Sequence, residues 1–389
     1  MKKNTIRWLV ALFACTLSTG ISAQGFPFGP KPIKPADQVV IIHAGQLLAV
    51  PGEAPLSKHS VVIRNDTVTE VRAGYLSIDD IDTGGVPAEV IDLRQHFVLP
   101  GLMDSHVHLA RATGAYSPGI TQVNTYPAKG DATVNAMVNI RLHLNAGFTA
   151  VRDLGSDHES VFAVRDAINR GHLAGPTIIA SGTSISVTGG HGDDSTSSDP
   201  AKKAVAGVCD GPAQCRTLTR HLEKTGADLI KIRITGGFSS NTGFKQQMTF
   251  EEMQAIINAA HLRGIPVTAH AYASDAIQDA IRAGIDAIEH GHLLDDETIA
   301  MMKDNDVFLI PTVIVANPPS MIKQFLGGRK PISVTLRDEY QSFEKAYKAG
   351  VKVAFGTDCG VYPHGENVDE LVEMVRLGMT PADAVRSAT

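Results

Sequence analysis

Two histidines separated by one residue, His106 and His108, are the first side chains of this sequence whose type and spacing suggest chemistry. They lie near the end of the apolar stretch 99–109, which turns at Pro100-Gly101. On a β-strand, side chains two positions apart point to the same face, so both imidazoles could hold one metal ion. On its own, such a pair favours two ordinary strand histidines, and further ligands are needed to support a metal site.

Four more polar residues stand at or near the ends of later apolar stretches: Lys231, His270, His290 and Asp358. Each has an ordinary alternative, because strand-end histidines often bond backbone groups and an aspartate often caps a helix. Lys231 is less ordinary, since an unpaired ammonium inside an apolar strand is costly to bury. In a parallel barrel the C-terminal strand ends meet at one face. The set therefore predicts one cluster of polar side chains at that face.

The elements that must position these residues change character along the chain. Residues 38–98 carry short strands separated by turns, which predicts an all-β segment too small to bury its own core without partner strands. The family resemblance given below implies that this segment is the N-terminal part of a β-sandwich domain. Residues 99–389 alternate strands and helices, and several helices end in glycine. Eight strand–helix units predict an α/β fold, a (β/α)₈ TIM barrel. The strand candidates are 98–107, 148–151, 177–180, 229–234, 266–270, 287–290, 307–311 and 352–358.

The sequence ends in a helix at 366–377 and the start of another at 380–386. No strands follow that could pair with residues 38–98. We therefore expect a barrel truncated after strand eight, with the C-terminal strands of the sandwich missing.

The first residues are typical of an export signal. Lys2, Lys3 and Arg7 precede an apolar run at 8–17 that is too short to span a bilayer, and Ala23 is a plausible cleavage point. We expect a signal peptide at 1–23, a linker at 24–37, and a periplasmic or secreted protein with no membrane attachment after signal removal. The net charge of −6 disfavours a nucleic-acid partner.

Cys209 and Cys215 flank a turn-rich segment. Export to an oxidising compartment favours a local disulfide, whereas two free thiols are the alternative, and the spacing leaves both open. Cys359 is left without a partner.

The ordered set of polar residues resembles the metal-dependent amidohydrolase superfamily. The likeness rests on His106-Val107-His108, Ile230-Lys231-Ile232, Ala269-His270-Ala271, Glu289-His290-Gly291 and Gly356-Thr357-Asp358. Residues 188–193, 235–237 and 362–367 are similar to those of the branch that contains imidazolonepropionase-like enzymes, Xaa-Pro and Xaa-basic dipeptidases, and ochratoxin-degrading amidases.

This resemblance implies a site for two divalent metal ions, for which zinc fits the nitrogen and oxygen ligands best. His106, His108 and Asp358 would hold one ion, and His270 and His290 the other. Lys231, carbamylated by carbon dioxide, would bridge both. A metal-activated hydroxide would attack the amide carbonyl, and Asp358 would carry the proton as the catalytic residue.

The substrate contacts are four further predictions. Arg233 lies two residues after Lys231 and so shares its strand face; it either clamps a substrate carboxylate or orders a loop through a salt bridge. By resemblance, His191 and Tyr272 line the pocket. His364 stands near a strand end and could contact substrate.

These observations predict a secreted hydrolase that cleaves the amide bond of a dipeptide or an N-acyl amino acid. Two alternatives stay open: a cyclic-amide hydrolase of the imidazolonepropionase type, and an inactive truncated binding protein or fragment. The expected partner is a small-molecule or dipeptide substrate, and a homo-oligomer is not excluded.

Overall fold

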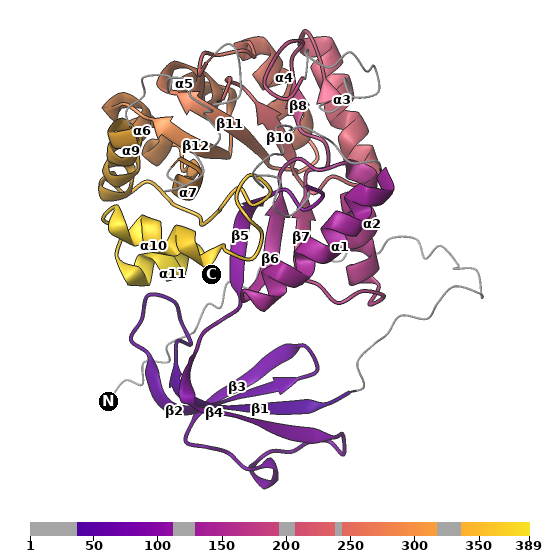
Figure 1. The fold of residues 1–389 in the computed structure, drawn as a ribbon, viewed down its shortest axis with the longest axis vertical. Helices are drawn as coiled ribbons and strands as arrows, with labels where there is room; N and C mark the ends of the chain where they lie inside the picture. Colours follow the sequence, from indigo (N-terminus) through magenta and orange to yellow (C-terminus); the bar gives the residue numbers. More distant parts are fainter. Residues whose placement is uncertain (1–36, 112–128, 194–206, 238–242, 317–335) are drawn as a thin grey trace, which may run out of the picture.

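The computed structural model describes residues 37–111, 129–193, 207–237, 243–316 and 336–389. The predicted signal peptide and most of the linker lie outside these residues. The described chain has two parts, a small β-sheet and a larger mixed α/β part that carries the helices (Figure 1). Within this described portion, no helix is long and apolar enough to cross a membrane.

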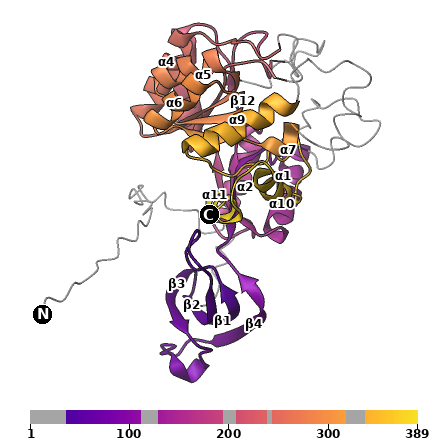
Figure 2. The ribbon, with the colours of Figure 1, turned by 90° about the vertical axis from the view of Figure 1, so that its left-hand side faces the viewer.

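The small part is a four-stranded sheet in the order β3-β2-β1-β4. Asn65, in a left-handed conformation with φ 58°, belongs to the two-residue turn that joins β2 to β3. Val39, Ile41, Val62 and Ile81 form a small buried cluster. Figure 2 shows the sheet standing apart from the helices. Its strands are β1 (Val39–Leu47), β2 (Leu56–Arg64), β3 (Thr67–Ala73) and β4 (Ala88–Val98), with a 3₁₀ turn at Ile78–Asp80.

The larger part contains two parallel sheets, of three and six strands, in the orders β5-β6-β7 and β13-β12-β11-β10-β8-β9. The three-stranded sheet comprises β5 (Leu102–Val107), β6 (Phe148–Asp153) and β7 (Thr177–Ala180). The six-stranded sheet comprises β8 (Ile185–Ser186), β9 (Gly207–Val208), β10 (Ile230–Arg233), β11 (Val267–Ala273), β12 (Ala287–Leu293) and β13 (Phe308–Ile310).

Backbone contacts link the two sheets at both edges. On one side, Leu309 pairs with Val353, and Val107 pairs with Cys359. On the other, the Asp228 amide donates to the Ala180 carbonyl at 2.9 Å. The strand predicted at 352–358 was wrong as a regular element, because this segment makes isolated bridges instead of a continuous ladder. It still lies between β13 and β5, as an eighth strand would.

Helices surround the sheets of the larger part (Figure 1). Gly226 and Gly284 end α3 and α5 in the left-handed conformation, as their positions predict. The helices are α1 (Lys129–Asn145), α2 (His158–Asn169), α3 (Pro212–Thr225), α4 (Phe250–His261), α5 (Ser274–Ala283), α6 (Asp296–Asp304), α7 (Val313–Ala316), α9 (Leu336–Ala349), α10 (Val368–Arg376) and α11 (Pro381–Ser387).

Strands β10, β11 and β12 are buried on both faces, which positions the polar residues that they carry. Along β10, Ile230 and Ile232 alternate with Lys231 and Arg233, and all four are buried. The isoleucines belong to the main hydrophobic cluster, whereas the alternate positions carry the charged groups to the opposite face. Cys209 and Cys215 form a disulfide at the start of α3, which settles the alternative left open by the sequence.

Candidate metal centre

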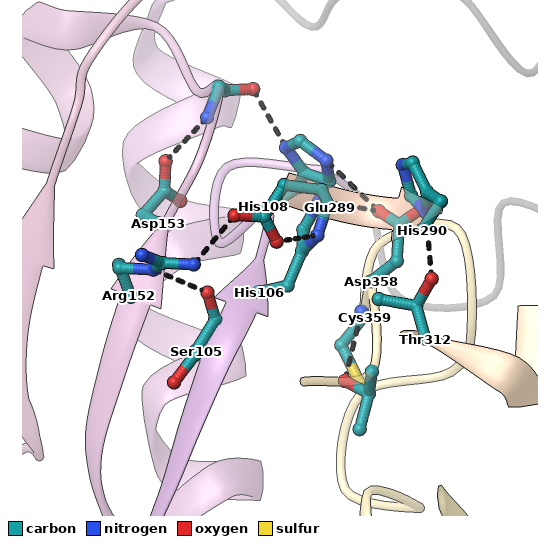
Figure 3. A network of polar contacts seen from close by, with 12 residues as sticks. Ser105, His106, His108, Arg152, Asp153, Glu289, His290, Thr312, Asp358 and Cys359 are labelled. Carbon is teal, nitrogen blue, oxygen red and sulfur yellow. Dashed lines mark hydrogen bonds and ion pairs between the residues drawn. The ribbon is translucent and has the colours of Figure 1, made fainter. Parts of the chain in front are cut away.

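Three residues come together at one point: His106 on β5, His108 directly after β5, and Asp358 at the end of the predicted eighth strand. Each offers one ligand atom, and these atoms lie within 4.8 Å of one another. Asp358 Oδ1 is 3.0 Å from His108 Nε2 and 3.5 Å from His106 Nε2 (Figure 3). Asp358 is held in the left-handed region with φ 57°, a conformation that costs a non-glycine residue about 1 kcal/mol or more. The three residues therefore meet as the sequence predicted.

The second nitrogen of each histidine has a partner that fixes its proton. His106 Nδ1 lies 2.8 Å from Glu289 Oε2, and His108 Nδ1 lies 3.0 Å from the Gly155 carbonyl. Both partners accept hydrogen bonds, so each Nδ1 carries the proton and each Nε2 keeps its lone pair. Burial, with Lys231, lowers the pKa of His106 to about 4. Burial, with Arg111, holds the pKa of His108 well below its usual value.

In this arrangement the lone pairs of the histidine Nε2 atoms face the lone pairs of Asp358 Oδ1. His108 Nε2 and Asp358 Oδ1 are both acceptors at 3.0 Å, and Oδ1 has no hydrogen-bond donor among the described residues. Two buried acceptors at that distance repel unless a cation lies between or beside them. The donor set of two imidazoles and one carboxylate thus fits a divalent metal ion.

Lys231 is buried on β10, and its Nζ has no hydrogen-bond partner in the described part of the chain. Burial lowers the pKa of Lys231 to about 7, although Glu289 and Asp358 act to raise it. An amine with this pKa is partly neutral near pH 7. Its uncharged form is a nucleophile, which an ordinary surface lysine seldom provides.

His270 on β11 and His290 on β12 lie edge to face, with ring centres 4.7 Å apart. His290 also lies 5.2 Å from His106, ring centre to ring centre. His290 Nδ1 bonds the Thr312 hydroxyl at 2.7 Å, whereas His270 uses Nε2, at 3.2 Å from the Gly236 carbonyl. Each ring keeps one nitrogen for a ligand. Burial holds the pKa of both well below the usual range, so both are neutral.

Glu289 is a residue of this site that the sequence analysis quoted only as the neighbour of His290. Its Oε1 lies 2.6 Å from Arg152 Nη2 and also accepts a hydrogen bond from the Thr268 hydroxyl. Although burial raises the pKa of Glu289, Arg152, Lys231 and His106 together lower it to about 2. It is therefore a permanent carboxylate behind His106. A charged residue inside the apolar strand 287–290 was the signal that could have identified it.

Asp104 is a second residue that sequence reasoning missed. Its buried carboxylate accepts from the His106 amide at 3.0 Å, the Thr357 amide at 3.1 Å and the Thr357 hydroxyl at 2.6 Å. Asn367 Nδ2 donates to it at 2.5 Å. Burial raises the pKa of Asp104 to about 6, and these hydrogen bonds oppose that rise. Asp104 thus connects the strand of His106 to the residue before Asp358.

Three of the four predicted substrate contacts lie beside the ligand histidines. His191 stacks on His270 with ring centres 4.4 Å apart, and Tyr272 stacks on His290 at 5.2 Å. Arg233 Nη1 lies 3.4 Å from the His191 carbonyl. A Cβ on Gly192 would come within 2.0 Å of the Arg233 guanidinium, so a glycine is needed there.

The fourth, His364, is placed differently. It is 5% exposed, and its Nδ1 lies 2.9 Å from His143 Nε2 on α1. Its Nε2 is enclosed and makes no hydrogen bond with the described residues. The structure therefore places His364 in a buried pair of histidines. Its predicted contact with substrate stays a prediction.

Comparisons with known proteins agree with this geometry. The family model described as "Amidohydrolase family" matches residues 97–389. An ochratoxinase of Aspergillus niger is 30% identical over 380 residues, covering 90% of this chain and 75% of that protein. A crystal structure of a Xaa-Pro dipeptidase with bound methionine matches with a TM-score of 0.78 and 34% identity, covering 90% of this chain and 87% of the other. A prolidase complexed with N-methylphosphonate-L-proline matches with a TM-score of 0.75 and 29% identity, covering 90% and 86%.

Proposed function

On the premise that this chain belongs to the amidohydrolase family and is a hydrolase of amide bonds, we propose that it cleaves a dipeptide or an N-acyl amino acid with two divalent metal ions. The observation that carries the proposal is the 3.0 Å approach of two acceptors, His108 Nε2 and Asp358 Oδ1. This approach is stable only with a cation present. The similarity to a Xaa-Pro dipeptidase and an ochratoxinase supports an amide substrate of this kind.

The ligands divide between two ions as the sequence resemblance implies. His106, His108 and Asp358 would hold one ion, and His270 and His290 the other, with zinc as the ion that suits these ligands best. Lys231 would bridge them as a carbamate, formed when its neutral amine adds carbon dioxide and releases a proton. The unpartnered Nζ of Lys231 supports this role, because a carbamate facing two cations removes the cost of a buried ammonium.

The bound ions would supply a Lewis acid for the carbonyl and activate a water molecule near neutral pH. The remaining steps belong to side chains. Asp358 takes the proton of the attacking water and delivers it to the leaving amine. Glu289 keeps His106 in the correct tautomer and orientation. Arg233 orients a substrate carboxylate beside His191 and Tyr272, which border the ligand histidines.

We further infer that the two parallel sheets make one closed (β/α)₈ barrel. The Leu309–Val353 and Val107–Cys359 bridges support closure on one side, and the Asp228–Ala180 hydrogen bond supports it on the other. Closure would gather the C-terminal strand ends around Lys231. Residues 38–98 would form part of a sandwich, and export rests on the signal-like residues 1–23.

The test is metal analysis of the purified protein, followed by hydrolysis assays with dipeptides, N-acyl amino acids and one cyclic amide, with and without chelator. We expect two metal ions per chain and chelator-sensitive release of the amine. Asp358→Asn should bind metal more weakly and lose hydrolysis. Fewer than two ions together with no chelator-sensitive hydrolysis would refute the proposal. Cleavage of the cyclic amide alone would reassign the substrate class.

A further inference from the structure

A second group of buried side chains lies behind the metal centre, on the side of α1. It consists of His143, Cys359 and His364, whose possible ligand atoms lie within 4.8 Å of one another. His143 is fully buried, and nothing in the sequence analysis singled it out. The group invites two interpretations: a third metal site, or a hydrogen-bonded chain. The direction of each hydrogen bond decides between them.

The chain begins at Asn367, whose amide can be oriented from its partners. Its Nδ2 lies 2.5 Å from the Asp104 carboxylate, and its Oδ1 accepts from the Gly365 amide at 3.2 Å. The second hydrogen of that Nδ2 points to His143 Nδ1 at 3.0 Å. His143 Nδ1 is therefore an acceptor, and the proton of this neutral ring lies on Nε2.

His143 Nε2 donates to His364 Nδ1 at 2.9 Å, which places the proton of His364 on Nε2. Both facing nitrogens are thus used in a hydrogen bond, and neither offers a lone pair to a metal. The Cys359 thiol donates to the Pro363 carbonyl at 3.3 Å. These directions favour a chain of fixed tautomers over a metal site.

The chain leads to a metal ligand. His364 follows Pro363, whose carbonyl accepts the hydrogen bond of the Cys359 thiol, so His364 belongs to the segment that begins directly after Asp358. The His108 amide donates to the Cys359 carbonyl at 2.7 Å, and a Cβ on Gly360 would lie 2.9 Å from the His108 carbonyl oxygen. His108 is therefore held through its backbone by the segment that follows Asp358.

We propose that His143 is a positioning residue of the metal centre, which acts through His364 and Asn367 on the segment that follows Asp358. The Asp104 carboxylate, which accepts from Asn367 at the start of the chain, also holds the His106 amide and Thr357, the residue before Asp358. One hydrogen-bonded network thereby fixes all three ligands of one ion. This inference rests on the proposed function, in which these three residues hold that ion.

The test uses the full chain and three substitutions. His143→Phe keeps the ring shape and removes both hydrogen bonds, whereas His143→Gln keeps a donor near the position of Nε2. His158→Phe is the control, because His158 lies at the start of α2 and its Nδ1 contacts the Thr183 hydroxyl instead of a residue of the hydrogen-bonded chain. A thermal melt of each variant reports folding, and chelator competition measures the affinity of a single ion in a His270→Ala background.

We expect His143→Phe to lower the affinity for that ion by about 10- to 100-fold, which is the usual effect of removing a residue that supports a metal ligand. The loss should be smaller with His143→Gln and absent with His158→Phe. In the metal-free protein, ¹⁵N NMR should show His364 protonated on Nε2, and this preference should disappear in His143→Phe.

Unchanged ion affinity in a folded His143→Phe protein would overturn the inference. So would a third bound ion that is lost in Cys359→Ser, since that result would make the group a metal site. If the folded wild-type protein binds no ion at all, the proposed function itself fails, and the NMR result still reports whether the chain of tautomers exists.

Discussion

Glu289 Oε2 lies 2.8 Å from Nδ1 of His106, a residue 183 positions earlier in the sequence. The other oxygen of that carboxylate lies 2.6 Å from Arg152 Nη2. Glu289 has a fully buried side chain, and its negative charge is balanced by Arg152 on β6. It therefore links a metal-ligand candidate to a fixed cation.

Replacing Glu289 with Gln should reduce both metal affinity and stability. The amide can still contact His106, but it carries no charge to polarise the imidazole or to balance Arg152. We expect about 10- to 100-fold weaker metal binding and a fall of about 3 kcal/mol in the free energy of unfolding. Chelator competition and urea unfolding measure these two effects. Glu344→Gln removes an exposed pair with Lys348 and should change stability by less than about 1 kcal/mol; equal effects of the two substitutions would contradict the assigned role.

Lys231→Ala should abolish hydrolysis and reduce the metal content to below two ions per chain. The substitution removes the bridge but leaves a space in which a small carboxylic acid can bind. Acetate or propionate should therefore restore part of the activity. Lys345→Ala, at an exposed lysine paired with Asp296, is the matched control and should behave as wild type. Full activity of Lys231→Ala would show that the lysine does not bridge the ions.

The ligand candidates could be predicted from the sequence because each lies in or next to an apolar strand-like stretch, and the period of a strand fixes which face a side chain takes. The residues that support them could not. Asp104 bonds Thr357 and Asn367, which are 253 and 263 residues away, and His143 bonds His364 across 221 residues. The residues next to Asp104 and His143 in the sequence do not indicate these partners, because the partners approach only when the chain has folded and the two sheets are joined.

Local signals were also insufficient for the segment 352–358. Its apolar run predicted a regular strand, yet the structure forms isolated bridges there and turns Asp358 to a positive φ. Packing at the junction of the two sheets overrides the strand propensity of this segment. The exception falls at a proposed ligand, where a conformational cost is compensated by the site.

Arg233→Met should raise KM for substrates that carry a free carboxylate and leave kcat nearly unchanged. The side chain keeps its buried volume but loses a charge-assisted hydrogen bond, worth about 1.5–3 kcal/mol and therefore about 10- to 100-fold in KM. The matched substrate with an amidated C-terminus should show no such change. If both substrates lose affinity equally, Arg233 orders the loop around His191 instead of binding the carboxylate.

Because Glu370 is buried, its ionisation should lower the free energy of unfolding as the pH rises. On α10, its two oxygens accept from the Val313 and Ile314 amides at 2.9 and 2.8 Å. Burial raises the pKa of Glu370 from 4.5 to about 8. Between these values the folded state holds a proton that the unfolded state has released, so the stability contributed by this group is lost as pH rises through the window.

Glu370→Gln removes this proton uptake. Relative to the wild type, the variant should therefore become more stable by ~4 kcal/mol between about pH 5 and about pH 8.5. At the lower pH it should be the less stable protein, because its NH₂ group faces one of the two backbone amides. Urea unfolding of the metal-free proteins at both pH values measures the difference. A stability difference that stays constant with pH would mean that Glu370 ionises normally despite its burial.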